Sequence, residues 1–144
     1  MKKFLSLVFC LALAGMNQAA PQSPVGQWQT IDDETGAPKS RVTLWLKDDK
    51  LLGRIDTLLN PDEPNPICDE CKGARKDQPI EGMTFVWGLT ENGVQWDGGI
   101  ILDPGNGKEY KARLRLIDQG ERLEVRGYIG FALLGRTQIW QRLP

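Results

Sequence analysis

The sequence of 144 residues contains no histidine. Histidine is the usual general base beside a serine or cysteine nucleophile, the usual proximal ligand of haem and a common ligand of zinc. Its absence excludes nucleophile–histidine pairs, histidine-ligated haem and zinc sites of the mixed histidine types. We therefore expect a protein that is not an enzyme and that has no metal site and no cofactor.

An excess of basic side chains is also missing, because 18 lysine and arginine residues stand against 19 aspartate and glutamate residues. Binding to nucleic acid requires a clustered basic face, so we expect no nucleic-acid partner. Beyond the N-terminus, no apolar run has the length of a membrane-spanning helix. We accordingly expect no transmembrane anchor in the mature protein.

The N-terminus has the three parts of a secretory signal peptide. Residues 1–3 carry positive charge, residues 4–16 are apolar but too short to span a bilayer, and small residues follow at Ala19 and Ala20. We predict a signal peptide over residues 1–19, with cleavage near Ala19 or Ala20, and one domain over residues 20–144. Two lysines before a short apolar region are typical of bacterial export, so the expected location is the periplasm, with secretion as the alternative.

Eight segments alternate apolar and polar residues in the pattern of half-buried strands. Most of their connections are too short for a parallel crossover, so we predict an all-β, eight-stranded, antiparallel, up-and-down barrel. A sandwich of two sheets is the alternative. Residues 131–134 are predicted as one helical turn or an apolar loop. The predicted strands cover residues 25–31, 41–47, 51–59, 83–89, 94–102, 108–116, 122–129 and 136–142.

The one long irregular segment, residues 60–82, contains both cysteines that remain after cleavage, Cys68 and Cys71. In an oxidising compartment this pair predicts a local structural disulfide. A metal site and a thiol–disulfide catalyst are the alternatives. A zinc site lacks further ligands in this chain, and the negative neighbours Asp69 and Glu70 disfavour a reactive thiolate.

Three residues at the two ends of the predicted barrel point to the way it closes. The first and last strands pair in a closed barrel, which would bring Trp28 close to Arg142. We predict that Arg142 lies on the face of Trp28 and seals one end through a cation–π contact. Gly26, Trp28 and Arg142 resemble the G-x-W start and the terminal basic residue of the lipocalin and calycin barrels.

An ordered series of motifs runs through nearly the whole mature chain. The motifs are Gly26-x-Trp28-x-Thr30-Ile31-Asp32-Asp33-x-Thr35-Gly36, Lys39-Ser40, Cys68-x-x-Cys71-x-Gly73, Pro79-Ile80-x-Gly82-Met83, Trp96-x-Gly98-Gly99, Asp103-Pro104, Gly107-Lys108-x-Tyr110, Arg126-Gly127-Tyr128-Ile129-Gly130 and Leu134-Gly135-Arg136-Thr137-Gln138-x-Trp140. This series resembles the uncharacterised family of secreted bacterial proteins called domain of unknown function 2147. The resemblance implies an exported lipocalin-like barrel with no established activity.

Large aromatic side chains on the predicted strands would either fill a solid core or line a cavity. An eight-stranded barrel allows both, since it is filled by its own side chains or holds one small ligand. Alternation along residues 83–89 places Met83, Phe85, Trp87 and Leu89 on one face. The ligand-binding candidates, with the polar groups that would orient a ligand, are Phe85, Trp87, Trp96, Tyr110, Arg126, Tyr128, Gln138 and Trp140.

The leading hypothesis is a periplasmic lipocalin-like protein that carries or senses a small apolar or amphipathic ligand. The alternative is a non-catalytic envelope protein-interaction module with a solid barrel, whose segment 60–82 contacts an unknown protein partner. An enzyme that works without histidine is a third hypothesis. Its candidate carboxylates, Asp32, Asp33, Asp97 and Asp103, lie mostly in predicted turns, where aspartate bonds the local backbone.

Overall fold

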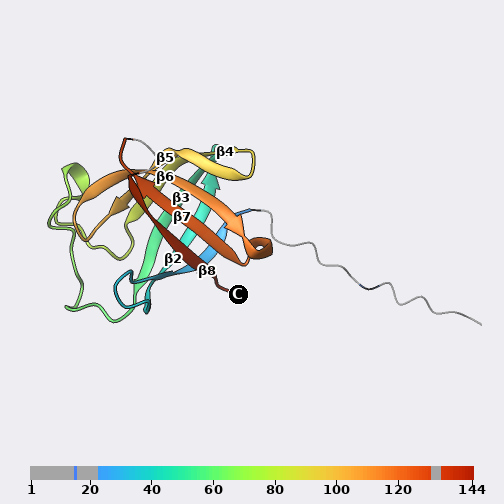
Figure 1. Ribbon diagram of the computed structural model, residues 1–144. Coiled ribbons are helices and arrows are strands. Elements are labelled where there is room, and N and C mark those ends of the chain that lie inside the picture. Colours follow the sequence, from blue (N-terminus) through green and yellow to red (C-terminus); the bar gives the residue numbers. More distant parts are fainter. Residues whose placement is uncertain (1–14, 16–22, 131–133) are drawn as a thin grey trace, which may run out of the picture.

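A computed structural model describes residue 15, residues 23–130 and residues 134–144. The predicted signal peptide, apart from residue 15, lies outside the described residues, as does most of the segment 131–134. The described chain contains eight β-strands and two short 3-10 helices (Figure 1). They are β1 (Gly26–Ile31), β2 (Pro38–Lys47), β3 (Lys50–Leu58), η1 (Gly73–Arg75), β4 (Thr84–Asn92), β5 (Gln95–Asp103), β6 (Lys108–Ile117), η2 (Asp118–Gly120), β7 (Arg122–Tyr128) and β8 (Gly135–Arg142).

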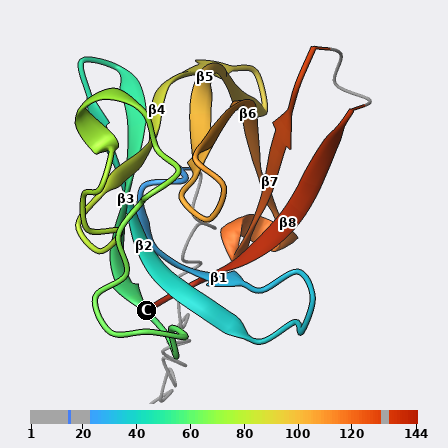
Figure 2. The ribbon, with the colours of Figure 1, turned by 90° about the vertical axis from the view of Figure 1, so that its left-hand side faces the viewer.

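The eight strands form one closed antiparallel barrel in which neighbours follow chain order and β8 pairs with β1. Figure 2 shows the strands following one another around the barrel. Short connections, such as the two residues between β2 and β3, permit only antiparallel neighbours. Closure pairs the first strand with the last through Trp28 with Arg142 and Gln29 with Gln141. The predicted all-β, up-and-down barrel is confirmed, and the sandwich alternative is wrong.

One end of the barrel is filled by its own side chains. This end carries the connections β2–β3, β4–β5 and β6–β7, together with the start of β1 and the end of β8. Buried leucines from several strands and Trp28 belong to one hydrophobic cluster, as expected for a tightly packed protein interior. Its fully buried residues are Trp28, Val42, Leu44, Leu51, Leu89, Ala112, Leu114 and Leu123.

The regular alternation of side chains is interrupted on β4. The pairing of β3 with β4 shifts register between Leu51 and Gly53 and again between Gly53 and Arg54. Each shift leaves a residue without a partner and turns the side chains that follow to the other face. Phe85 and Leu89 are buried as predicted, but Trp87 does not share their face.

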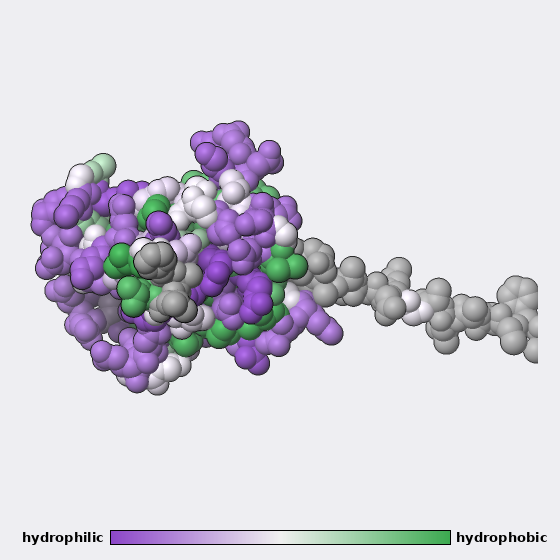
Figure 3. Space-filling view, turned by 45° about the horizontal axis from the view of Figure 1, so that its top comes forward, coloured by the Kyte–Doolittle hydropathy of each residue, from purple (hydrophilic) through white to green (hydrophobic). Residues whose placement is uncertain are grey.

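The surface of the barrel is largely hydrophilic. In the view of Figure 3, hydrophilic side chains cover most of the face, and hydrophobic ones form small separate patches. Among the described residues, no helix combines the length and the apolar character that crossing a membrane requires.

Candidate ligand-binding cavity

The end of the barrel opposite the filled end contains a cavity of about 910 Å³. This volume falls within the range of about 300–1,000 Å³ that is usual for small-molecule sites. Residues from all eight strands line it, and most of the side chains in its wall are apolar or aromatic. They include Ile55, Leu58, Phe85, Ile101, Leu102, Tyr110, Val125, Gln138 and Trp140.

We call the deepest part of this cavity the floor, and it consists of Thr30, Ser40, Ile55, Phe85, Val125 and Trp140. On the same strands, Trp28, Val42 and Leu123 lie two residues further from the opening and belong to the filled end. The rings of Phe85 and Trp140 lie 6.0 Å apart between their centroids. The floor therefore separates a solid half of the barrel from a hollow half.

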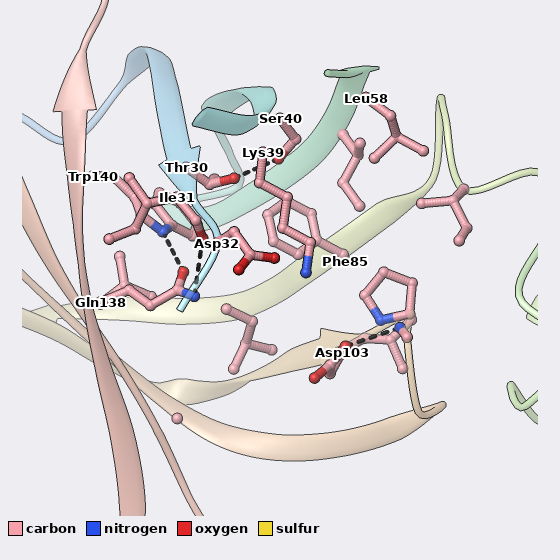
Figure 4. A pocket seen from close by; sticks show the side chains of 18 of the residues that line it. Thr30, Ile31, Asp32, Lys39, Ser40, Leu58, Phe85, Asp103, Gln138 and Trp140 are labelled. Atoms are coloured by element: carbon pink, nitrogen blue, oxygen red, sulfur yellow. Dashed lines mark hydrogen bonds between the residues drawn. The ribbon is translucent and has the colours of Figure 1, made fainter. Parts of the chain in front are cut away.

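A chain of hydrogen bonds fixes the position of Trp140 at the floor (Figure 4). Trp140 Nε1 donates to Gln138 Oε1 at 3.0 Å. Gln138 Nε2 in turn donates to Asp33 Oδ1 at 2.9 Å and to the backbone oxygen of Ile31 at 3.4 Å. These bonds tie β8 to the end of β1, so the indole is held in one orientation toward the cavity.

The opening of the cavity, which we call the mouth, carries charged side chains. Two basic and four acidic residues line it, so its formal charge is negative: Lys39, Arg136, Asp32, Asp62, Glu63 and Asp103. Figure 4 shows the Lys39 ammonium directed toward the middle of the cavity. Arg136 is paired at 2.8 Å with Asp33 and at 3.7 Å with Asp103.

Asp32 lies at the mouth, but its carboxylate accepts hydrogen bonds from residues of its own turn. The backbone N–H groups of Thr35 and Glu34 donate to its Oδ1 atom, and they hold the pKa of the carboxyl below its ordinary value. The hydroxyl of Thr35 donates to the same oxygen. Asp32 therefore acts first as a turn residue, the role that the sequence predicts for it.

The structure brings together four of the eight predicted ligand-binding candidates in the cavity: Phe85, Tyr110, Gln138 and Trp140. The other four do not line it. The guanidinium of Arg75 covers Trp87 at 4.1 Å from the ring centroid, and Arg126 Nη1 donates to Thr137 Oγ1 on the neighbouring strand β8 at 2.9 Å. Trp96 and Tyr128 are half-buried at positions away from the cavity.

Sequence reasoning missed the two floor hydroxyls, Thr30 and Ser40. A signal for them existed, because Ser40 continues the inward alternation of Val42 and Leu44 backward by two residues. The predicted strand began at residue 41, whereas β2 begins at Pro38. Ser40 therefore falls just outside the predicted strand, although it lies inside the observed one.

The irregular segment between β3 and β4 contributes one side of the mouth through Asn60, Pro61, Pro66 and Ile80, together with Asp62 and Glu63. Cys68 and Cys71 are joined by a disulfide, with their Cα atoms 5.3 Å apart. The disulfide lies against the β5–β6 turn, where Cys68 Sγ is 3.3 Å from the backbone oxygen of Pro104.

The β5–β6 turn requires glycine at position 107 for two reasons. Gly107 has φ +71°, and a Cβ atom there would lie 2.0 Å from the backbone oxygen of Glu70. The positive φ favours glycine, and only a residue without a side chain permits so close an approach. The disulfide segment is therefore seated on the barrel by backbone contact.

We expect the double variant Cys68→Ser/Cys71→Ser to lower the free energy of unfolding by at most about 2 kcal/mol, because the disulfide closes a very short loop. Urea denaturation followed by circular dichroism measures this change, with the barrel spectrum retained. Thiol titration of the denatured protein without residues 1–19, produced in an oxidising compartment, should find no free thiol. Two free thiols would contradict the disulfide.

The barrel closes where Trp28 of β1 is in register with Arg142 of β8. The guanidinium carbon lies 4.3 Å from the centroid of the indole. Arg142 also donates to three backbone oxygens: Nε to Gly120 at 2.7 Å, Nη1 to Val25 at 3.1 Å and Nη2 to Ser23 at 2.8 Å. Burial lowers the pKa of this guanidinium, and the nearby Glu121 carboxylate opposes that effect.

Gly26 gives the Arg142 side chain room to reach these oxygens. Its φ of +138° favours glycine, and an added Cβ atom would lie 3.0 Å from Arg142 Nη1. The three residues Gly26, Trp28 and Arg142 thus form one contact at the filled end, as their sequence pattern predicts.

The closed eight-stranded barrel with one sealed end has a lipocalin-like fold. Protein HP1028 from the human pathogen Helicobacter pylori, which belongs to the lipocalin family, has a solved structure similar to this one, with a TM-score of 0.72. The two are 19% identical, over 83% of this chain and 82% of that chain, which shows a shared fold. Residues 26–142 match the family described as uncharacterized protein conserved in bacteria (DUF2147), and the chain belongs to that family. No curated protein matches the sequence.

Proposed function

We propose that this protein is an exported, periplasmic carrier or sensor that binds a small apolar or amphipathic molecule inside its barrel. The observation that carries the proposal is the cavity of about 910 Å³, with an apolar wall and a charged mouth. Export is supported by the signal-peptide pattern of residues 1–19. A binding role without catalysis agrees with a chain that has no histidine.

Burial of apolar surface would supply most of the affinity. Each CH₂ group moved from water into the cavity contributes about 0.8 kcal/mol, so a chain of about eight to ten carbons offsets the several kcal/mol lost on association. The wall is built on barrel strands, so little ordering of the protein is needed on binding. A sugar, which offers little apolar surface, gains much less from such a wall.

The hollow interior also weighs against the rival hypothesis of a solid interaction module. That hypothesis required the aromatic side chains to fill the barrel. Trp87 and Trp96 are only half-buried and do not line the cavity. Phe85 and Trp140 are buried at the floor and leave the space between the floor and the mouth open.

We expect the protein to bind N-phenyl-1-naphthylamine, a neutral apolar probe whose emission rises in an apolar site. At a probe concentration of about 100 times Kd, binding should stabilise the folded state by about 2.7 kcal/mol and raise the thermal midpoint. Extraction of natively purified protein with organic solvent should release a co-purified small molecule. Ile101→Trp, which adds an indole to the wall, should weaken binding.

Val94→Trp is the matched control, because Val94 is 82% exposed in the β4–β5 connection and lies outside the cavity lining. It adds the same group to the surface and should leave binding unchanged. No emission change, no midpoint shift and an empty extract would together reject the proposed function.

A further inference from the structure

The floor of the cavity contains a buried pair of hydroxyl groups. Thr30 Oγ1 and Ser40 Oγ lie 2.6 Å apart, and both residues are 6% exposed. Within the described residues, neither hydroxyl makes another side-chain or backbone hydrogen bond. Two hydroxyls carry two protons, and either oxygen can act as the donor in their mutual bond. One O–H group of the pair therefore stays available to a third atom.

The donors of the other polar groups at or beside the floor already make hydrogen bonds within the protein. Trp140 Nε1 donates to Gln138, and the two protons of Gln138 Nε2 go to Asp33 and Ile31. The remaining floor side chains, Ile55, Phe85 and Val125, are apolar. The Thr30–Ser40 pair is thus the polar group of the floor that can donate a hydrogen bond to a molecule in the cavity.

We propose that the Thr30–Ser40 pair is a subsite for a neutral oxygen acceptor, and that the ligand is an apolar molecule carrying a carbonyl, ester or alcohol group at the end that enters first. This inference rests on the proposed function and specifies its ligand class. An apolar molecule without such an oxygen leaves the spare O–H unpaired or traps a water beneath it, and both outcomes weaken its binding.

A carboxylate does not suit the floor. Burying a charge in an apolar site is costly unless a cation is close by, and no basic residue belongs to the floor. Arg136 lies at the mouth, and Lys39 extends from the mouth with its ammonium toward the middle of the cavity (Figure 4). Arg136 is already paired with Asp33 and Asp103. The mouth has a negative formal charge, which opposes the entry of an anion. The negative formal charge of the mouth and the lack of a basic residue at the floor therefore both favour a neutral ligand.

The test compares three probes on the mature protein: 2-decanone, decanoate and N-phenyl-1-naphthylamine, which has no oxygen. The first two are measured by displacement of the third. In the double variant Thr30→Val/Ser40→Ala, we expect the affinity for 2-decanone to fall about tenfold relative to that for N-phenyl-1-naphthylamine, because the carbonyl loses its donor. Each single variant keeps one hydroxyl, so its affinity for 2-decanone should fall less than that of the double variant.

Thr57→Val is the matched control, because Thr57 is an exposed threonine of β3 outside the cavity lining. This variant should change neither the affinity for 2-decanone nor that for N-phenyl-1-naphthylamine. An unchanged affinity ratio in the double variant overturns the subsite. It is also overturned if decanoate binds wild type more tightly than 2-decanone and loses that advantage in Lys39→Gln, since the polar group would then lie at the mouth.

The infrared carbonyl stretch of 2-decanone bound to the wild-type protein gives a second measurement that needs no variant. A hydrogen-bonded carbonyl absorbs at lower frequency than the same ketone in an alkane solvent, and an unshifted band rejects the subsite even if the double variant fails to fold. Failure of the proposed function looks different, because wild type then binds none of the three probes. If N-phenyl-1-naphthylamine binds but the double variant leaves the ratio of the two affinities unchanged, the subsite is rejected and the proposed function stands.

Discussion

Trp28→Ala should lower the free energy of unfolding by about 4 kcal/mol, the size expected when a fully buried tryptophan is truncated. Trp28 has no exposed surface, and its Nε1 donates to the backbone oxygen of Pro24 at 2.8 Å. Removing the indole leaves a hole in the filled end and takes away the surface on which Arg142 rests. Since domains of this size are stable by about 5–15 kcal/mol, the variant should be close to unfolding.

Urea denaturation followed by far-ultraviolet circular dichroism measures this loss without depending on tryptophan emission. Trp28→Phe keeps an aromatic ring and loses the hydrogen bond, so it should cost less than the alanine variant. Trp45→Ala is the control, because Trp45 is only half-buried on β2. The guanidinium carbon of Arg54 lies 5.8 Å from the centroid of its ring. A loss below about 1 kcal/mol for Trp28→Ala would mean that the filled end does not hold the barrel together.

Arg142→Ala should lower the free energy of unfolding by about 3 kcal/mol, because it removes three charge-assisted hydrogen bonds as well as the cation–π contact. The backbone oxygens of Ser23, Val25 and Gly120 then lose a donor at the point where β1 and β8 meet. Arg142→Lys keeps the charge but not the planar fork, so it should recover only part of the loss.

Arg122→Ala is the matched control, since Arg122 is an exposed arginine paired at 3.0 Å with Asp118. Surface pairs of this kind contribute at most about 1 kcal/mol. A double-mutant cycle of Trp28→Ala with Arg142→Ala should show coupling, because the two side chains touch. Additive losses, or equal unfolding midpoints for Arg142→Ala and Arg122→Ala, would contradict closure through this pair.

Much of the fold could be predicted from local patterns. The alternation on β6 and β7 places Leu114, Leu123 and Val125 inside, as the structure has them. The prediction failed on β4, where Trp87 turns away from Phe85 and Leu89. That difference depends on how β4 pairs with β3, a contact between two strands that no local pattern contains.

The cavity could be predicted only in part. Large aromatics on strands suggested Phe85 and Trp140, and these two meet at the floor. Lys39 and Arg136 come to one mouth from the starts of different strands, which short sequence patterns do not reveal. The Thr30–Ser40 pair joins residues ten positions apart through the register of β1 and β2.

The sequence by itself determined that the chain forms eight short antiparallel strands, that Trp28 and Arg142 mark the ends that meet, and that Cys68 and Cys71 lie within reach of each other. These features follow from alternation, short turns and close spacing, which are local. Only the tertiary structure decided that one half of the barrel is solid and the other hollow. Whether an interior fills depends on the side chains that opposite walls project toward one another, and register shifts between strands set those directions.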